Sequence, residues 1–165
     1  MYNVALLIER QLAEIDALQI IELHEGVDDD VTYHLVLPVE NSAVLLSASM
    51  SALAAGQLIP LTEPQGVEEV QQEIEDEGTA ELNASTALLR SKGLTVTSRL
   101  TTDDPVSTLV EVATSTSADE IIILTEPHVV REFLHLDWTS QVRRELDIPT
   151  LHLLEHRAFE DQQEL

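Results

Sequence analysis

Short apolar runs, each about the length of a β-strand, recur along the chain. They lie at residues 4–8, 31–39, 94–100, 121–124 and 150–154. A run without polar interruption, such as Ile121-Ile122-Ile123-Leu124, is typical of a strand that is buried on both faces of a parallel sheet. Residues 94–100 (LTVTSRL) alternate between apolar and polar positions, which predicts a strand with one face in contact with water.

Segments with helical character separate these runs. The stretch 11–25 carries apolar residues at three-residue steps, namely Leu12, Ile15, Leu18 and Ile21. Gly26 is placed to end that helix. The small apolar residues of 43–55 also predict a helix. Asp104-Pro105 predicts a third helix start, with aspartate as N-cap and proline in the first turn.

A long helix is predicted over residues 65–91. Its apolar residues share one face on both sides of an expected break at Gly78, and they are Val67, Val70, Ile74, Leu82, Leu88 and Leu89. Lys92-Gly93 supplies a cation and a glycine, which are both typical of a helix end.

Strands that alternate with helices in this way predict an α/β fold, with a five-stranded parallel sheet and helices on both faces. We assign residues 1–156 to one domain, with an insertion at about 41–64 in the crossover between the second and third strands. Residues 157–165 form an acidic C-terminal tail. Ligands in such sheets bind beyond the carboxyl ends of the strands, so residues 125–140 are the first place to expect a site.

Charge is the most unusual feature of the composition. Asp and Glu number 31 against 8 Lys and Arg, which gives a net charge of −23, and Lys92 is the only lysine. Such a protein stays soluble at high salt and repels itself at low salt. Without a basic surface, neither nucleic acid nor an anionic membrane is an expected partner. The lack of a signal-peptide pattern and of a long apolar stretch indicates a cytoplasmic protein.

Residues 103–156 resemble the universal stress protein family. The shared features are the Asp104-Pro105 helix start, the run ADEIIILT (118–125) and the closing IPTLHLLEH (148–156). The order of elements extends the resemblance over nearly the whole chain, and 125–154 is similar to the haloarchaeal branch. The family implies a Rossmann-like three-layer sandwich with strand order 3-2-1-4-5. It also implies a homodimer through the fifth strand, here 150–154.

Many members of this family bind ATP through a loop after strand four, of the form G-x2-G-x9-G-(S/T). The resemblance places the two loop glycines at Pro127 and Val130 and the last glycine near 137–140, so all of these glycines are missing. Side chains with a Cβ obstruct the close approach of backbone to phosphate. The family's aspartate at the end of strand one has Glu9 as its nearest counterpart. These departures argue against ATP binding in the usual mode.

An altered pocket at the same place is the alternative. Arginine and histidine side chains there could recognise a carboxylate or phosphate, or they could form internal contacts that close the loop. The hydroxyls of Thr139 and Ser140 could hold an anion at a helix N-terminus, although Asp137 is more readily explained as the N-cap. The candidate ligand-binding residues are Glu9, Arg10, Thr125, His128, Arg131, Asp137, Thr139 and Ser140.

No motif assigns a catalytic or a metal site. The six histidines lack the spacing of a zinc site, and His34 and His152 are expected to pack in or beside strands. We therefore expect a non-enzymatic stress-response module without a required cofactor, which works through its dimer or a protein partner. The alternatives are a sensor that binds ATP, AMP or another small anion and, with less support, an enzyme acting on a phosphorylated metabolite.

Overall fold

The structure is a computed structural model that describes residues 1–39, 64–125 and 146–154. Strands and helices alternate along it, as the apolar runs predict. In chain order they are β1 (Tyr2–Ile8), α1 (Glu14–His24), β2 (Val31–Pro38), α3 (Pro64–Ser91), β3 (Thr95–Thr101), α4 (Pro105–Thr116), β4 (Glu120–Thr125) and β5 (Thr150–Leu154). No helix among them is both long enough and apolar enough to cross a lipid bilayer.

The five strands form one parallel sheet in the order β3-β2-β1-β4-β5, which confirms the predicted fold class. At its centre, Leu6 of β1 pairs with Leu35 of β2 on one side and with Ile122 of β4 on the other. All three side chains are buried. Strands covered on both faces need the unbroken apolar runs seen in the sequence. Because the chain order reverses between β1 and β4, a crevice is expected at their carboxyl ends.

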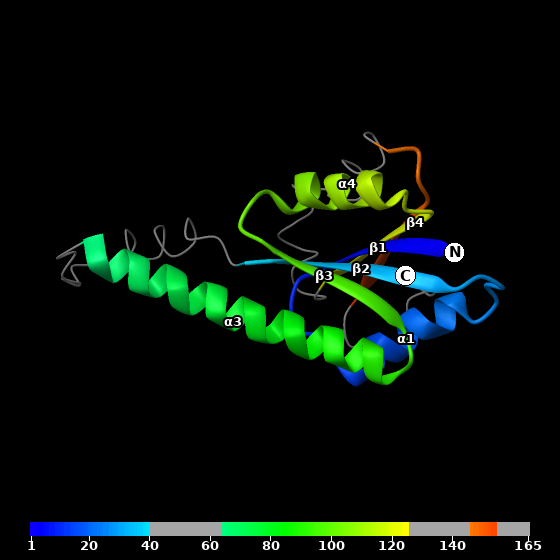
Figure 1. Cartoon of the computed structure of the whole chain (residues 1–165), viewed down its shortest axis with the longest axis horizontal. Helices are drawn as coiled ribbons and strands as arrows, with labels where there is room; N and C mark the ends of the chain where they lie inside the picture. The colour runs from blue at the N-terminus through cyan, green and yellow to red at the C-terminus, as the bar shows by residue number, and fades with distance from the viewer. Residues whose placement is uncertain (40–63, 126–145, 155–165) are drawn as a thin grey trace.

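Helices cover both faces of the sheet (Figure 1). On the face of α1 and α3, Leu6 and Leu89 belong to one apolar core. On the face of α4, Leu7 and Leu109 belong to a second core. Successive residues of β1 enter different cores because the side chains of a strand point alternately to its two faces.

The buried face of α1 is not the one that its apolar spacing suggests. Ile15 and Leu18 are 41% and 46% exposed. The helix instead buries Asp16, Ala17, Gln19, Ile20 and His24. Steps of three residues drift around a helix with 3.6 residues per turn, so Ile15, Leu18 and Ile21 do not share one face, and Leu12 precedes the helix. The sequence pattern therefore located this helix correctly but selected the wrong face.

The predicted break at Gly78 is also wrong, since α3 runs without interruption from Pro64 to Ser91. A Cβ on Gly78 would lie 3.1 Å from Cδ1 of Leu100 and 3.6 Å from Cγ2 of Val39. The glycine therefore marks a close approach of the helix to the ends of β2 and β3.

The predicted start of α4 is confirmed. The carboxylate of Asp104 accepts a hydrogen bond from the N–H of Ser107 at 2.8 Å, and Pro105 occupies the first turn. The aspartate satisfies one of the N–H groups that a helix start leaves without a partner, while proline has no N–H to satisfy.

The ends of α3 and α4 use the same turn with different residues. Gly93 follows α3 as predicted and has a φ of +88°, whereas Ser117 follows α4 with a φ of +51°. Each N–H bonds back into the last turn of its helix, to the carbonyls of Arg90 and Thr114. Glycine is favoured at this left-handed position, so Ser117 carries backbone strain that Gly93 avoids.

Several predicted features lie outside the described residues. They include the helix at 43–55, most of the insertion at 41–64 and the tail at 157–165. These remain predictions.

Candidate functional site

The carboxyl ends of β1 and β4 lie side by side where the strand order reverses. Ile8, the last residue of β1, pairs with Leu124 of β4. Glu9 and Arg10 follow directly on β1, and Thr125 is the last residue of β4. The structure therefore places these predicted site residues at the edge of the sheet where ligands bind in this class of fold.

The hydroxyl of Thr125 has a partner inside the protein. It lies 2.8 Å from Nε2 of His152, on the neighbouring strand β5. Thr125 itself is buried. His152 lies on a strand, as predicted, although its side chain is exposed. A ligand that used the threonine hydroxyl would have to share it with this histidine or displace it.

The loop that carries Glu9 and Arg10 is fastened to α3. The N–H of Leu12 donates to Oγ of Ser85 at 2.9 Å, and the same hydroxyl donates to the carbonyl of Glu81 at 2.8 Å. Ser85 is fully buried. It satisfies a backbone donor that would otherwise lack a partner. Sequence reasoning missed this contact because a lone serine within a helix belongs to no motif.

Carboxylates also follow β3 at this edge of the sheet, where β2 separates β3 from β1. Asp103 is exposed, and Asp104 next to it caps α4. Together with Glu9 they give the described part of the carboxyl edge an acidic character, with Arg10 as the basic neighbour of Glu9. Negative charge at this edge opposes the binding of a phosphate.

The other candidate residues lie outside the described residues, and they are His128, Arg131, Asp137, Thr139 and Ser140. Their expected position across the crevice from Glu9 and Arg10 stays a prediction.

Comparison with solved structures finds the same architecture in other proteins. The universal stress protein from Archaeoglobus fulgidus in complex with dAMP shares 12% sequence identity, covering 92% of this chain and 97% of that chain, with a TM-score of 0.53. A protein of the universal stress protein family from Burkholderia pseudomallei shares 15% identity over 92% of this chain and 96% of that chain, with a TM-score of 0.52. The fold is that of the universal stress proteins.

A third solved structure extends the same comparison. A hypothetical protein whose biochemical function was assigned from its structure aligns with a TM-score of 0.62, at 15% identity over 96% of this chain and 99% of that chain. At such identities these similarities confirm the resemblance at the level of the fold. No protein-family model matches the chain, and no curated protein matches it in sequence.

A second cluster of polar side chains lies at the opposite, amino end of the sheet. His24, in the last turn of α1, places Nε2 3.1 Å from Oε2 of Glu120 on β4 and Nδ1 2.9 Å from the hydroxyl of Tyr33 on β2. The hydroxyl of Tyr2, on β1, donates to the same oxygen of Glu120 at 3.2 Å. Sequence reasoning missed this cluster because Tyr2 and Glu120 are 118 residues apart and no local spacing connects them.

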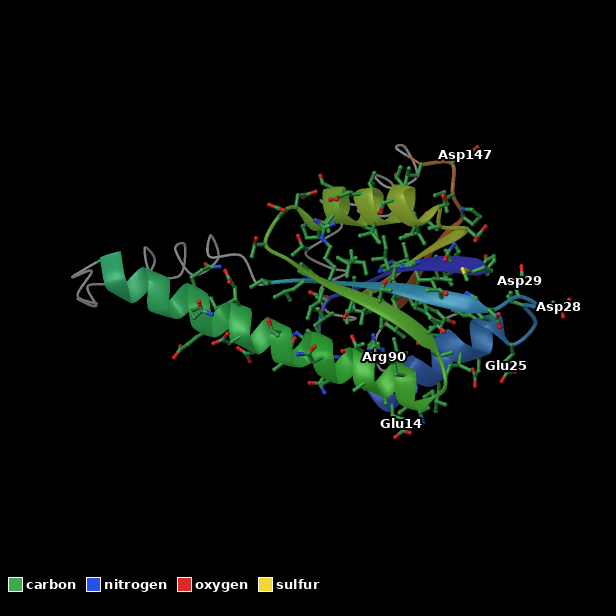
Figure 2. The ribbon with its side chains drawn as sticks, in the orientation of Figure 1. Glu14, Glu25, Asp28, Asp29, Arg90 and Asp147 are labelled. Carbon is green, nitrogen blue, oxygen red and sulfur yellow. The ribbon has the colours of Figure 1, made fainter. Side chains whose placement is uncertain are left out.

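An open cavity of about 570 Å³ adjoins this cluster, and His24 and Tyr33 contribute to its lining. Glu25, Asp29 and Asp30 line it as well. Figure 2 shows Glu25 and Asp29 at this end of the molecule, beside the turn between α1 and β2. Within the described ranges, no group of three or more side chains is arranged to hold a metal ion.

Proposed function

We propose that this chain is a stress-response module of the universal stress protein type, without enzymatic activity, that does not hold ATP by the usual glycine loop. The fold supports the type, because universal stress protein structures align with 92% of the chain. The observation that argues against the usual glycine loop is that residues 126–140, which follow β4, contain no glycine.

The described carboxyl edge supports the same conclusion. A triphosphate needs backbone N–H groups and positive charge close to its oxygens. This edge instead presents the carboxylates of Glu9 and Asp103, and the Thr125 hydroxyl already contacts His152. Pro127 has no N–H to offer, and Val130 brings a branched side chain to a position where the family's loop has none.

A nucleotide- or small-anion-binding sensor is the second candidate. It is favoured by the universal stress protein structure in complex with dAMP, which shares this fold. In such a sensor, side chains in place of loop backbone would hold the anion. Arg10 from the end of β1 would act with His128 and Arg131 from the segment after β4.

Thermal unfolding in molar KCl separates the two candidates when ATP, ADP, AMP, cyclic nucleotides and inorganic phosphate are tested in turn. A ligand present at about 100 times its Kd adds about 2.7 kcal/mol to the free energy of unfolding, which visibly raises Tm. We expect no rise with ATP. A rise with AMP or phosphate alone would favour the sensor, and a rise with ATP would contradict the main proposal.

We also propose that the chain works as a homodimer, formed through β5, in the cytoplasm of a salt-adapted cell. β5 lies at the edge of the sheet, and an edge strand presents backbone groups that another strand can pair with. The net charge of −23 and the single lysine suit a high-salt solvent. Light scattering in molar KCl should give twice the mass of one chain, and the mass of a single chain would contradict the dimer.

A further inference from the structure

His24 faces hydrogen-bond acceptors with both of its ring nitrogens. Nδ1 lies 2.9 Å from the carbonyl oxygen of Ile20, one turn earlier in α1, and Nε2 lies 3.1 Å from the Glu120 carboxylate. A carbonyl and an ionised carboxylate can only accept. A neutral imidazole has a single N–H, so one of its nitrogens would face an acceptor with a lone pair. The doubly protonated ring donates to both acceptors and carries the charge that pairs with Glu120. A neutral ring with its N–H on Nε2 would keep the contact with Glu120 and accept from the Tyr33 hydroxyl at Nδ1, but it would have no charge and no hydrogen for the Ile20 carbonyl.

The position of the ring favours the same charged form. His24 lies in the last turn of α1, where the helix dipole stabilises a cation. Burial by itself lowers the pKa of His24. The hydrogen bond to Glu120, the bond to the Ile20 carbonyl and the charge of Glu120 together outweigh burial, and they raise the pKa above its ordinary value of 6.5.

The two tyrosines beside the ring remain protonated. The ring centroids of Tyr2 and Tyr33 lie 5.9 and 5.4 Å from that of His24. Burial, followed by the charge of Glu120, raises the pKa of each tyrosine. The Tyr33 hydroxyl accepts from Nδ1 when that nitrogen is protonated and donates to it when it is not, while the Tyr2 hydroxyl donates to Glu120.

The other charged groups around the ring are mostly acidic. Asp119 precedes Glu120 and accepts from the N–H of Asn3 at 2.9 Å, and the adjoining cavity is lined by Glu25, Asp29 and Asp30. The nearby cations have their own partners, since the N-terminal ammonium lies 3.4 Å from Asp29, and Lys92 pairs with Glu14. Within the described residues, His24 is therefore the basic group that faces Glu120.

We propose that His24 is a protonation latch: its imidazolium fastens the last turn of α1 to β2 and β4, and its deprotonation removes the charge that pairs with Glu120 and so loosens that turn together with the adjoining wall of the cavity. The folded chain binds this proton more tightly than the unfolded chain. The stabilisation from this ion pair is therefore fully present below the pKa of His24 in the unfolded chain, about 6.5. It is lost as the pH rises through the higher pKa of His24 in the folded chain. This inference does not depend on the proposed function.

NMR titration of the histidine rings in the full chain, at constant molar KCl, tests the first half of the proposal. The signal that disappears in His24→Gln should titrate above pH 6.5 in the wild type. Glu120→Gln keeps the shape of the side chain but removes its charge, so it should lower the proton affinity of His24 about tenfold, one pKa unit. A His24 signal that titrates at or below its ordinary value, or that ignores Glu120→Gln, would overturn the latch.

Hydrogen exchange tests the second half. The N–H of Val27 donates to the carbonyl of His24 at 3.0 Å, so it reports on the last turn of α1. Its protection, corrected for the intrinsic effect of pH, should fall as the pH rises through the pKa of His24. That pH dependence should vanish in Glu120→Gln, and in His24→Gln where this variant folds.

His34→Gln is the matched control. His34 lies on the other face of the sheet, where its ring contacts the Thr97 hydroxyl at 2.8 Å and the Asn3 side-chain oxygen at 3.3 Å. Burial lowers the pKa of His34. His34→Gln should therefore leave the pH dependence at Val27 intact. Loss of that dependence in the control, or protection that is flat with pH in the wild type, would reject the latch.

Discussion

The two ends of the sheet are held in different ways. At the amino end, contacts of His24 and Glu120 tie α1, β1, β2 and β4 directly to one another. At the carboxyl end, the described contacts join the elements in pairs, with Thr125 of β4 bonded to His152 of β5, the loop at Leu12 bonded to Ser85 of α3, and Thr101 of β3 bonded to Thr108 of α4. In parallel α/β sheets the carboxyl end carries the ligand site. The comparison teaches that one cluster at the amino end joins four elements, whereas the end where ligands bind in this class of fold is held by separate contacts between pairs of elements.

Removal of the Glu120 carboxylate at the amino end should lower the stability of the protein more than any other substitution considered below. Glu120→Ala leaves the buried His24 without its anionic partner and Tyr2 without its acceptor, so we expect a loss of about 2 kcal/mol in the free energy of unfolding below about pH 6.5. Urea unfolding in molar KCl measures the loss.

Glu111→Ala is the control for that substitution. Glu111 pairs with Arg99 at 3.2 Å, but the two side chains are 63% and 44% exposed, so its removal should change stability much less. Equal effects of the two substitutions would show that the amino-end cluster has no special role.

Removal of the serine hydroxyl at the carboxyl end should have a somewhat smaller effect. Ser85→Ala leaves the buried N–H of Leu12 without its acceptor, and we expect a loss of about 1–2 kcal/mol. Hydrogen exchange should show faster exchange at Leu12, while the amides of α1 near His24 stay protected. If both ends of the sheet loosen together, the two ends are not held independently.

The smallest expected effect is a gain in stability when Ser117 is replaced. Ser117 is exposed and has a left-handed backbone, so Ser117→Gly should raise the free energy of unfolding by about 1 kcal/mol. Ser115→Gly, two residues earlier and inside α4, should do the opposite because glycine weakens a helix. Thermal unfolding of both variants distinguishes backbone strain from a general effect of glycine.

The strands could be predicted because each apolar run satisfies a local requirement, as Ile121 to Leu124 do in the centre of the sheet. The helix caps at Asp104 and Gly93 are equally local. The break at Gly78 was predicted wrongly because the constraint on this position comes from another element. A side chain there would press on Leu100 of β3. The face of α1 was misinterpreted because the sheet beneath it decides which residues are buried.

The candidate site also combines features that local sequence predicts with contacts that it does not predict. Glu9 and Thr125 could be placed at one edge of the sheet, because the ends of adjacent parallel strands lie together. The bond from Thr125 to His152 and the contact of His24 with Glu120 could not be predicted, since each joins residues at least 27 positions apart. Such contacts depend on the packing of whole elements and leave no signature in sequence spacing.

The most direct test of the account is an ATP titration of isotope-labelled protein in molar KCl, followed residue by residue in NMR spectra. The amides of Glu9, Arg10 and Thr125 report on the carboxyl edge, and the amide of Glu120 at the amino end is the internal reference. We predict that ATP leaves the carboxyl-edge signals where they are. Saturable shifts confined to Glu9, Arg10 and Thr125 would show that ATP binds there without the glycine loop, and would contradict the account.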